Sequence, residues 1–319
     1  MKNALASSLN HTCDILVKEC AHVRQGEEVL VLADDLQAPE LSTAISTAAS
    51  KLRAHAVSVV YPAISPYREP PRTVLHAMKS SDVIIACSTT PIAGGIIEEA
   101  LKAGTRILSM FRITIDALCR TVPVDYRALT IEMKKIKKML DASHFVEISS
   151  SRGTHLKVQM ADRQTMLALG SIQKPGEIDF IPAGAIGVAP LEGTAEGKVV
   201  VDGTILGFGR CLKPITFEIE KGRVKGVKGG DDWKGLKELL RRDENAPMLC
   251  EIGLGANPKA KLVGGPEDER VRGSVHIGLG ENRYFGGTLA STSHLDGTML
   301  RATLKVDGKG LVKDGRLLI

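Results

Sequence analysis

The sequence predicts an α/β domain with a parallel sheet over residues 1–143, followed by an α+β, strand-rich domain over residues 144–319 that carries a metal site. In the first part, short apolar runs alternate with stretches of helical periodicity, which is typical of a parallel sheet covered by helices. In the second part, strands bounded by glycines predominate. The length of 319 residues also fits about two domains.

Four apolar runs in the first part are predicted to be strands, and the stretches between them to be helices. Prolines 70 and 71 suit the first turn of one helix, and Gly104 suits the end of another. A longer helix follows before the pattern changes. The expected strands are residues 29–33, 56–61, 82–87 and 106–110, and the expected helices are residues 38–52, 70–81, 91–103 and 126–140.

The pattern changes near residues 142–151, after which apolar and polar residues alternate. Residues 155–160 and 198–205 are predicted to be strands because their side chains alternate in this way. Residues 215–220 and 223–227, separated by Lys221 and Gly222, are predicted to form a hairpin. One amphipathic helix is expected over residues 232–242.

Composition excludes several classes of protein. The hydrophobic fraction of 43% and the charged fraction of 25% are ordinary for a folded globular chain. Aromatic residues make up only 3%, with Trp233 the single tryptophan, so a stacking platform for single-stranded nucleic acid is not expected. The densest basic run, residues 134–138, lies in a helical pattern and is interpreted as a solvated face. No nucleic-acid partner is therefore predicted.

Cysteine spacing and hydropathy predict the cellular setting. The six cysteines contain no CxxC pair, which argues against a zinc ribbon and a disulfide framework and favours reduced thiols. The first residues lack the apolar stretch of a signal peptide, and no run approaches about 18 uninterrupted apolar residues. We therefore expect a cytoplasmic protein with no membrane partner.

No nucleotide-binding motif follows the predicted strands of the first part. The turn after the first strand contains Asp34 and Asp35 but no glycine, and neither GxGxxG nor GxxxxGK[ST] occurs. Binding of NAD or ATP is therefore not predicted. The two aspartates could bind a group at the end of the strand, but they are interpreted as a solvated cap at the start of a helix.

Histidines and carboxylates are concentrated in strand-like segments near the C-terminus. His294 and Asp296 are two positions apart, so on a strand they project from one face and together can bind a cation. His276 lies within an apolar strand followed by glycines, and Glu251 begins another such strand. These four residues are the predicted metal ligands. Glycines at this density are interpreted as allowing close approach of the backbone to a metal or ligand.

Each of these residues also has a structural explanation that does not involve a metal. His294 and Asp296 would form a hydrogen-bonded pair, and His276 would be a core histidine. Glu251 would need a partner because an isolated buried charge is costly, and Arg272 or Arg283 would be its salt-bridge partner.

Several motifs, in order, resemble those of the thermophilic metallo-aminopeptidases of the aminopeptidase T and S type. Residues 250–258 resemble that family's E-x-G-x-G-x-N-P block, and residues 273–280 resemble its G-T-x-H-I-A-L-G block. Residues 285–287 and 294–297 resemble its G-G…H-x-D block, and residues 181–197 resemble its G-E-V block. The resemblance covers nearly the whole chain.

The resemblance implies a metal-dependent hydrolase of aminopeptidase type acting on a small peptide or amide. Zn²⁺, Co²⁺ or Mn²⁺ would be held by the four predicted ligands, polarising a carbonyl and activating water. Glu192 or Glu196 would be the general base, unless Glu192 only caps backbone amides of its turn, and Tyr284 or Arg283 would stabilise the oxyanion. The sequence departs from the family at Ala185, which replaces a ligand glutamate, and at Arg283, which replaces a tyrosine.

The same superfamily contains an oxygenase branch, the 2,5-dihydroxypyridine 5,6-dioxygenases, which is the alternative interpretation. That branch resembles this chain in length and also lacks the glutamate replaced by Ala185. It holds one Fe(II) with two histidines and one aspartate, of which His294 and Asp296 match two. Its other histidine aligns with Glu251, and it has no equivalent of His276, so His276 or Glu251 would complete the triad with His294 and Asp296. In this interpretation Arg283 or Arg210 would pair with the acidic oxygen of an aromatic substrate.

The resemblance also predicts partners. A small-molecule or peptide substrate is expected in either interpretation, and the family pattern implies a homo-oligomer. A ligand set of mixed nitrogen and oxygen donors does not select one divalent metal, because affinity order rather than the ligand set often decides.

Overall fold

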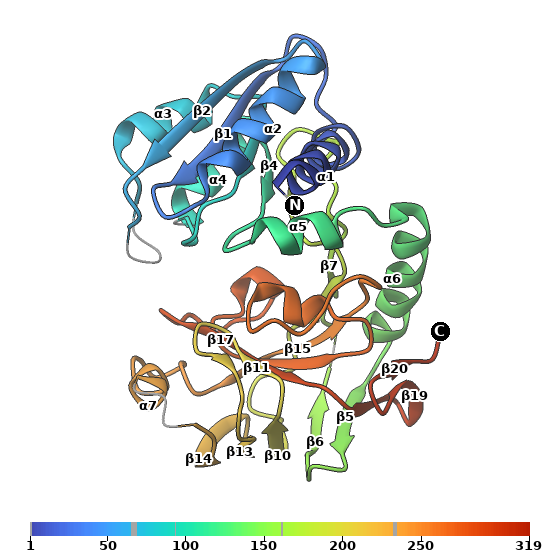
Figure 1. Ribbon diagram of the computed structural model, residues 1–319. Coiled ribbons are helices and arrows are strands. Elements are labelled where there is room, and N and C mark those ends of the chain that lie inside the picture. Colours follow the sequence, from blue (N-terminus) through green and yellow to red (C-terminus); the bar gives the residue numbers. More distant parts are fainter. Residues whose placement is uncertain (1, 65–68, 93, 161, 232–234) are drawn as a thin grey trace. The chain divides into compact units, whose positions relative to one another are not determined.

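The computed structural model describes residues 2–64, 69–92, 94–160, 162–231 and 235–319 (Figure 1). The chain forms two compact units. Unit 1 comprises Met1–Val124 and Ala168–Ala183, and unit 2 comprises Asp125–Leu167 and Gly184–Ile319. Unit 1 contains a parallel sheet with helices, and unit 2 contains antiparallel sheets, which confirms the predicted fold class.

The sheet of unit 1 has five strands in the order β2-β1-β3-β4-β8, and every neighbouring pair is parallel. Apolar runs at the expected positions form the first four. The fifth comes from the segment that returns to unit 1 late in the sequence, and it was not expected. The strands are β1 (Glu28–Asp34), β2 (His55–Tyr61), β3 (Val83–Ala86), β4 (Arg106–Ser109) and β8 (Ile178–Phe180).

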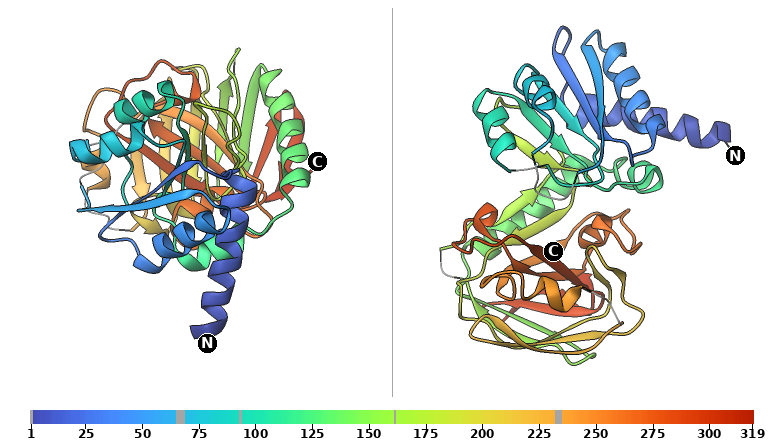
Figure 2. Two further views of the ribbon diagram at one scale, coloured as in Figure 1. Left: turned by 90° about the horizontal axis from the view of Figure 1, so that it is seen from above. Right: turned by 90° about the vertical axis from the view of Figure 1, so that its left-hand side faces the viewer.

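Successive residues of β1 and β3 are buried, and they point to opposite faces of the sheet. Both faces are therefore apolar, and helices cover both. Leu30, Leu32 and Ile84 pack with Met78 and Ile96, which come from α3 and α4. Helix α2 packs against β1 and β2, and α1 packs against α2. Figure 2 gives two further views of these layers. The helices are α1 (Lys2–Ile15), a π-helix (Leu16–Cys20), α2 (Pro39–Lys51), α3 (Arg72–Lys79), α4 (Gly94–Lys102) and α5 (Ile115–Thr121). Residue 93, within the expected helix 91–103, lies outside the described residues.

Unit 2 is built from two sheets and the expected helix α6 (Tyr126–Asp141). One sheet has the order β14-β13-β10-β6-β5-β18-β19-β20, and the other has the order β12-β11-β17-β16-β15-β9-β7. A Cβ atom at Gly297 of β17 would lie 2.8 Å from Val201 of β10, so the two sheets touch there. The strands are β5 (Phe145–Ser150), β6 (His155–Gln159), β7 (Met166–Ala168), β9 (Ala185–Val188), β10 (Glu196–Val201), β11 (Thr204–Ile205), β12 (Gly209–Arg210), β13 (Ile215–Glu220), β14 (Arg223–Gly229), β15 (Leu249–Gly255), β16 (Val275–Gly280), β17 (His294–Met299), β18 (Ala302–Val306), β19 (Lys309–Lys313) and β20 (Arg316–Leu317).

Two predicted elements of the second part differ in the structure. The expected strand 198–205 is divided into β10 and β11, which belong to different sheets. The division occurs because the Asp202 carboxylate accepts a hydrogen bond from the Leu300 amide, while Gly203 crosses close to the Thr298 backbone.

The expected helix 232–242 is only α7 (Leu236–Leu239). Gly235 adopts a left-handed conformation with φ of 94°, which a helix interior does not allow. After the helix, the Asp243 carboxylate accepts the Asn245 and Ala246 amides and closes a turn. Residues 232–234, which include Trp233, lie outside the described residues.

Among the described helices, none has the length and apolar character needed to cross a bilayer.

Candidate metal centre

Three neighbouring strands of unit 2 bring the four predicted ligands together. In the sheet register, His276 of β16 pairs with Gly253 of β15, and Asp296 of β17 pairs with Gly278 of β16. Glu251 also pairs with Gly278. Alternation along each strand then places the side chains of Glu251, His276, His294 and Asp296 on one face of the sheet.

The side-chain nitrogen and oxygen atoms of these residues lie within hydrogen-bond or ion-pair distance of one another. His294 Nε2 is 3.1 Å from Glu251 Oε2 and 3.0 Å from Asp296 Oδ1, and His276 Nε2 is 3.4 Å from Glu251 Oε1. One donor atom from each of Glu251, His276 and Asp296 fits within 4.8 Å of the others, and all three residues are buried. The cluster can therefore bind one small cation.

Glycines on the adjacent strands make room for these side chains. A Cβ atom at Gly253 would lie 1.8 Å from His276 Nε2, and one at Gly187 of β9 would lie 2.2 Å from Glu251 Oε1. The imidazole and the carboxylate thus lie across the neighbouring strand, over the glycine that faces them. These two glycines thus admit the side chains of predicted ligands.

The orientation of His294 is fixed by groups around its ring. Nδ1 is 2.8 Å from the Glu281 carbonyl oxygen and donates a hydrogen bond to it, which directs Nε2 toward the carboxylates. The thiol of Cys250 lies 3.6 Å from the same nitrogen. The ring of Phe285 stacks on the imidazole, with centroids 5.7 Å apart and an interplanar angle of 26°.

Electrostatics in the cluster favour a positive charge among the carboxylates. Burial lowers the pKa of His294, but the Asp296 carboxylate and Cys250 together outweigh burial and hold that pKa well above the usual value. Burial raises the pKa of Glu251, whereas hydrogen bonding to His276 and His294 brings it below the usual value. A divalent cation would take the place of these imidazole protons, because metal-binding histidines must be deprotonated.

Unpartnered polar atoms support a ligand-binding role for this face. His276 Nδ1, Glu269 Oε1 and Arg270 Nε are buried and have no hydrogen-bond partner among the described residues. Buried polar groups are normally hydrogen-bonded, so Glu269 Oε1 and Arg270 Nε are available to a group bound beside the cluster. The imidazole and carboxylate donors fit a divalent transition metal.

Glu269 and Arg270 were missed by sequence reasoning. They end the 3-10 helix Pro266–Arg270, which packs against β15, and they form an ion pair with each other. Burial, with Asp296 nearby, raises the pKa of Glu269 to about 7. The signal available in the sequence was an acidic segment, residues 267–269, shortly before His276.

The proposed salt-bridge partners of Glu251 are engaged elsewhere. Arg272 pairs with Glu132 of α6, and Arg283 pairs with Glu281. Glu251 is instead paired with the two histidines, so the interpretation as a buried arginine salt bridge is wrong.

The three predicted catalytic residues lie around a loop that follows β16. Glu192 accepts hydrogen bonds from Asn282 Nδ2 at 3.0 Å and from the Thr288 amide at 2.8 Å. Arg283 is exposed, with its Nε 2.7 Å from Glu281 Oε1. Tyr284 is 46% exposed, and its ring packs edge-on against Phe285.

The structure shows the surroundings of two other residues that the sequence analysis singled out, Ala185 and Asp34. Ala185 lies on β9 opposite Gly255 of β15, so this strand supplies no carboxylate at the position where the aminopeptidase pattern has one. Asp34 is buried and accepts the Thr89 amide at 2.6 Å and the Thr89 hydroxyl at 2.8 Å. The expected cap is therefore wrong, because Asp34 links the loops after β1 and β3.

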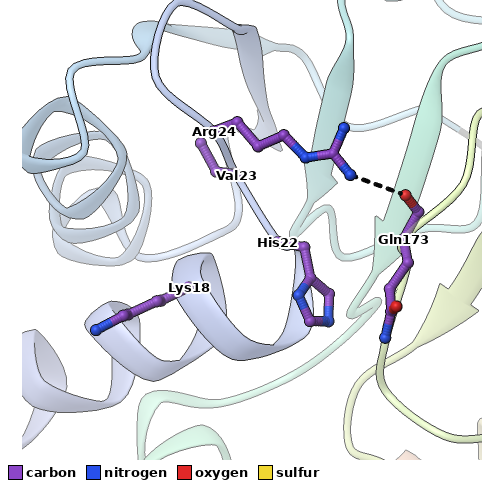
Figure 3. Close-up of a pocket in the computed structure, with 5 residues that line it drawn as sticks. All are labelled: Lys18, His22, Val23, Arg24 and Gln173. Carbon is purple, nitrogen blue, oxygen red and sulfur yellow. Dashed lines mark hydrogen bonds between the residues drawn. The ribbon is translucent and has the colours of Figure 1, made fainter.

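Unit 1 contains a separate hollow of about 250 Å³ (Figure 3). Arg24 Nη2 donates to the Gln173 carbonyl oxygen at 3.4 Å, and His22 Nε2 lies 3.0 Å from the Ser171 hydroxyl. The residues that line it are Lys18, His22, Val23, Arg24 and Gln173. This lining offers one imidazole and no carboxylate or thiol, which does not resemble the metal cluster of unit 2.

A family model and a curated relative indicate one family. The family model described as 2,5-dihydroxypyridine 5,6-dioxygenase matches residues 10–319. The 2,5-dihydroxypyridine 5,6-dioxygenase of Pseudomonas putida KT2440 is 25% identical, with 94% of this chain and 93% of that protein aligned.

Two solved structures share the fold. A 2,5-dihydroxypyridine dioxygenase from the same organism superimposes with a TM-score of 0.85 at 24% identity, covering 98% of this chain and 97% of the other. AmpT from Thermus thermophilus superimposes with a TM-score of 0.73 at 18% identity, covering 98% and 99%. The expected relation to the aminopeptidases is thus a shared fold.

The prediction of an aminopeptidase-type hydrolase is wrong. The family match over residues 10–319 and the curated relative both indicate the oxygenase branch, which was the alternative interpretation. The four retained ligand-type residues favoured the hydrolase in the sequence, but such residues suit either chemistry.

Proposed function

The chain belongs to the 2,5-dihydroxypyridine 5,6-dioxygenase family, and from this premise we propose that it is an iron-dependent dioxygenase that opens a hydroxylated N-heteroaromatic ring. The observation that carries the proposal is the family match over residues 10–319, and the cluster of two imidazoles and two carboxylates on β15, β16 and β17 supplies a candidate iron site. The Pseudomonas putida relative is, by its name, a 2,5-dihydroxypyridine 5,6-dioxygenase, and a dihydroxypyridine is the substrate we propose.

Four side chains of this chain would hold the metal. His294 would use Nε2, since its Nδ1 is committed to the Glu281 carbonyl. Asp296, Glu251 and His276 would supply the other donors. Iron(II) suits imidazole and carboxylate donors that leave open positions, and when bound it supplies the redox chemistry needed for molecular oxygen to react with an aromatic ring.

The protein side chains balance charge and handle protons. The carboxylates of Glu251 and Asp296 together neutralise a divalent cation, while Glu269 neutralises Arg270 beside it. This balance favours one metal rather than two. Glu269 Oε1 is buried and has no partner among the described residues, so it is chemically suited to accept a proton from a substrate hydroxyl group.

The apolar surroundings limit access of water to the cluster. Phe285 lies against the His294 ring, and Cys250 behind it is buried, with burial raising its thiol pKa to about 11. The Cys250 thiol lies beside His294 Nδ1 and not beside the Nε2 that would bind the metal, so it is poorly placed to compete for the metal.

Oxygen uptake tests the proposal directly. Protein purified without oxygen and loaded with one Fe(II) per chain should consume oxygen when 2,5-dihydroxypyridine is added, with loss of the substrate's ultraviolet absorbance. Pyridine without hydroxyl groups and zinc-loaded protein serve as controls, because zinc is redox-inert. Equal turnover by zinc-loaded protein, or no uptake by the iron-loaded protein, would contradict the proposal.

A further inference from the structure

We propose that Glu192 and Arg163 are positioning residues for the metal centre: they clamp the loop of residues 282–289 so that the Phe285 ring stays against His294. The inference rests on the proposed function only in treating the cluster as a metal site. It assigns to Glu192 a role different from general base, and it gives Arg163 a role that no sequence pattern indicated.

The loop of residues 282–289 is organised around one buried side chain. The backbone carbonyl of Asn282 accepts the Phe285 and Gly287 amides at 2.9 and 3.0 Å, and its Oδ1 accepts the Leu289 amide at 2.7 Å. A Cβ atom at Gly287 would lie 2.1 Å from Asn282 Cγ, so the chain wraps closely around this side chain.

Two residues outside the loop hold it in place. Glu192 Oε1 accepts Asn282 Nδ2 and the Thr288 amide, and Glu192 Oε2 pairs with Arg163. Arg163 Nη1 also donates to the Gly286 carbonyl at 2.6 Å. Both clamp side chains are only 15% exposed, so these are largely desolvated, charge-assisted hydrogen bonds, which are stronger than neutral ones.

Ionisation of Glu192 is consistent with this role. Burial raises the pKa of Glu192, but the hydrogen bonds from the Thr288 amide and Asn282, together with the Arg163 charge, bring it below the usual value. The clamp therefore stays charged near neutral pH, and both carboxylate oxygens are already occupied.

The loop places an aromatic ring on the metal ligands. Phe285 stacks on His294, and its Cε1 would lie 2.9 Å from a Cβ atom at Gly187, the glycine beneath the Glu251 carboxylate. A side chain packed on a metal-binding histidine limits movement of the imidazole and contact with water. The clamp thus acts on the ligands through Phe285 and touches none of the reacting atoms.

Limited proteolysis of the metal-free protein tests the clamp. Arg283 is the one trypsin site between Arg272 and Arg301, and its side chain is exposed. Glu192→Gln removes the charge and should speed cleavage after Arg283 about tenfold, because local opening becomes easier. Glu218→Gln is the matched control, since it breaks the exposed pair with Lys228 on β13 and β14.

Metal release from zinc-loaded protein tests the link to His294. With 4-(2-pyridylazo)resorcinol as the acceptor, Glu192→Gln should release zinc about tenfold faster than the wild type. Phe285→Ala should do the same while the loop stays resistant to trypsin. Arg163→Met should match Glu192→Gln, and the double variant should add little, because the two residues form one unit.

Unchanged trypsin cleavage and unchanged zinc release in Glu192→Gln would overturn the inference. If that variant fails to fold, Arg163→Lys, which keeps the charge but loses the two-armed contact, should give the same effects in weaker form. Neither readout uses oxygen or an aromatic substrate, so this inference and the proposed function can fail separately.

Discussion

Each unit contains a buried cluster of charges, and the two clusters differ in how completely they are satisfied. In unit 1, Arg106 of β4 donates from Nη2 to both oxygens of Glu27 at 2.7 Å. Its Nη1 donates to the carbonyl oxygens of Ala21, His22 and Ile172 at 3.1, 3.3 and 3.4 Å. We call this cluster closed because its charged groups are hydrogen-bonded within it. It joins the returning segment 168–183 to the rest of unit 1.

We call the cluster of unit 2 open because some of its buried polar atoms have no hydrogen-bond partner among the described residues. Its carboxylates and imidazoles pair with one another, yet His276 Nδ1, Glu269 Oε1 and Arg270 Nε have no partner in the described part of the chain. Burial and charge alone therefore do not mark a functional site, because Arg106 and Glu27 have both. What separates the two clusters is the set of donors and acceptors left over for a ligand.

The largest expected effect is the loss of metal from the open cluster. His294→Ala and Asp296→Ala should each abolish metal binding and lower activity by more than about a hundredfold, because each removes a donor on which the site depends. Far-ultraviolet circular dichroism should be unchanged. Elemental analysis per chain is the measurement, with His144→Ala, an exposed histidine of unit 2, as the control. Unchanged metal stoichiometry in both variants would refute the site assignment.

A large effect on stability, without an effect on the site, is expected for the closed cluster. Arg106→Met leaves Glu27 and three carbonyls without their donor and should lower the free energy of unfolding by about 3 kcal/mol. Metal content per folded chain should stay the same. Urea unfolding is the measurement, and Lys51→Met, which breaks an exposed pair with Asp14, should cost about 0.5 kcal/mol or less. A loss of metal in Arg106→Met would show that the two clusters are not independent.

Local patterns predicted the elements in which neighbouring residues decide the structure. The first four strands of unit 1 and helix α6 were predicted because each is a regular run bounded by turn or cap signals. The split between β10 and β11 was not, because it depends on contacts of Asp202 and Gly203 with residues almost a hundred positions later. The addition of β8 to the first sheet was not predicted either, because it depends on pairing with β4, which lies far earlier in the sequence.

The residues of the candidate site also fall into those that a local sequence pattern predicted and those that it did not. The four predicted ligands lie on strands, where alternation and neighbouring register bring them to one face. Glu269, Arg270 and Phe285 come from short 3-10 helices, which have no periodicity that points a side chain toward a given partner. The hydrolase interpretation failed for another reason: two imidazoles and two carboxylates indicate a candidate metal site, but they do not indicate the reaction of the metal.

The smallest expected effect concerns Gly253, whose lack of a side chain makes room for the His276 imidazole. Gly253→Ala should displace the His276 imidazole, because the new Cβ would lie 1.8 Å from Nε2, and metal affinity should fall about tenfold. Gly253 lies in a regular strand, so the backbone accepts alanine and the clash alone is tested. Gly265→Ala is the control, since its Cβ would meet nothing within 4 Å. Metal titration of both proteins decides the matter: an unchanged affinity in Gly253→Ala would mean that His276 is dispensable as a ligand, leaving His294 with the two carboxylates as the donors that hold the metal.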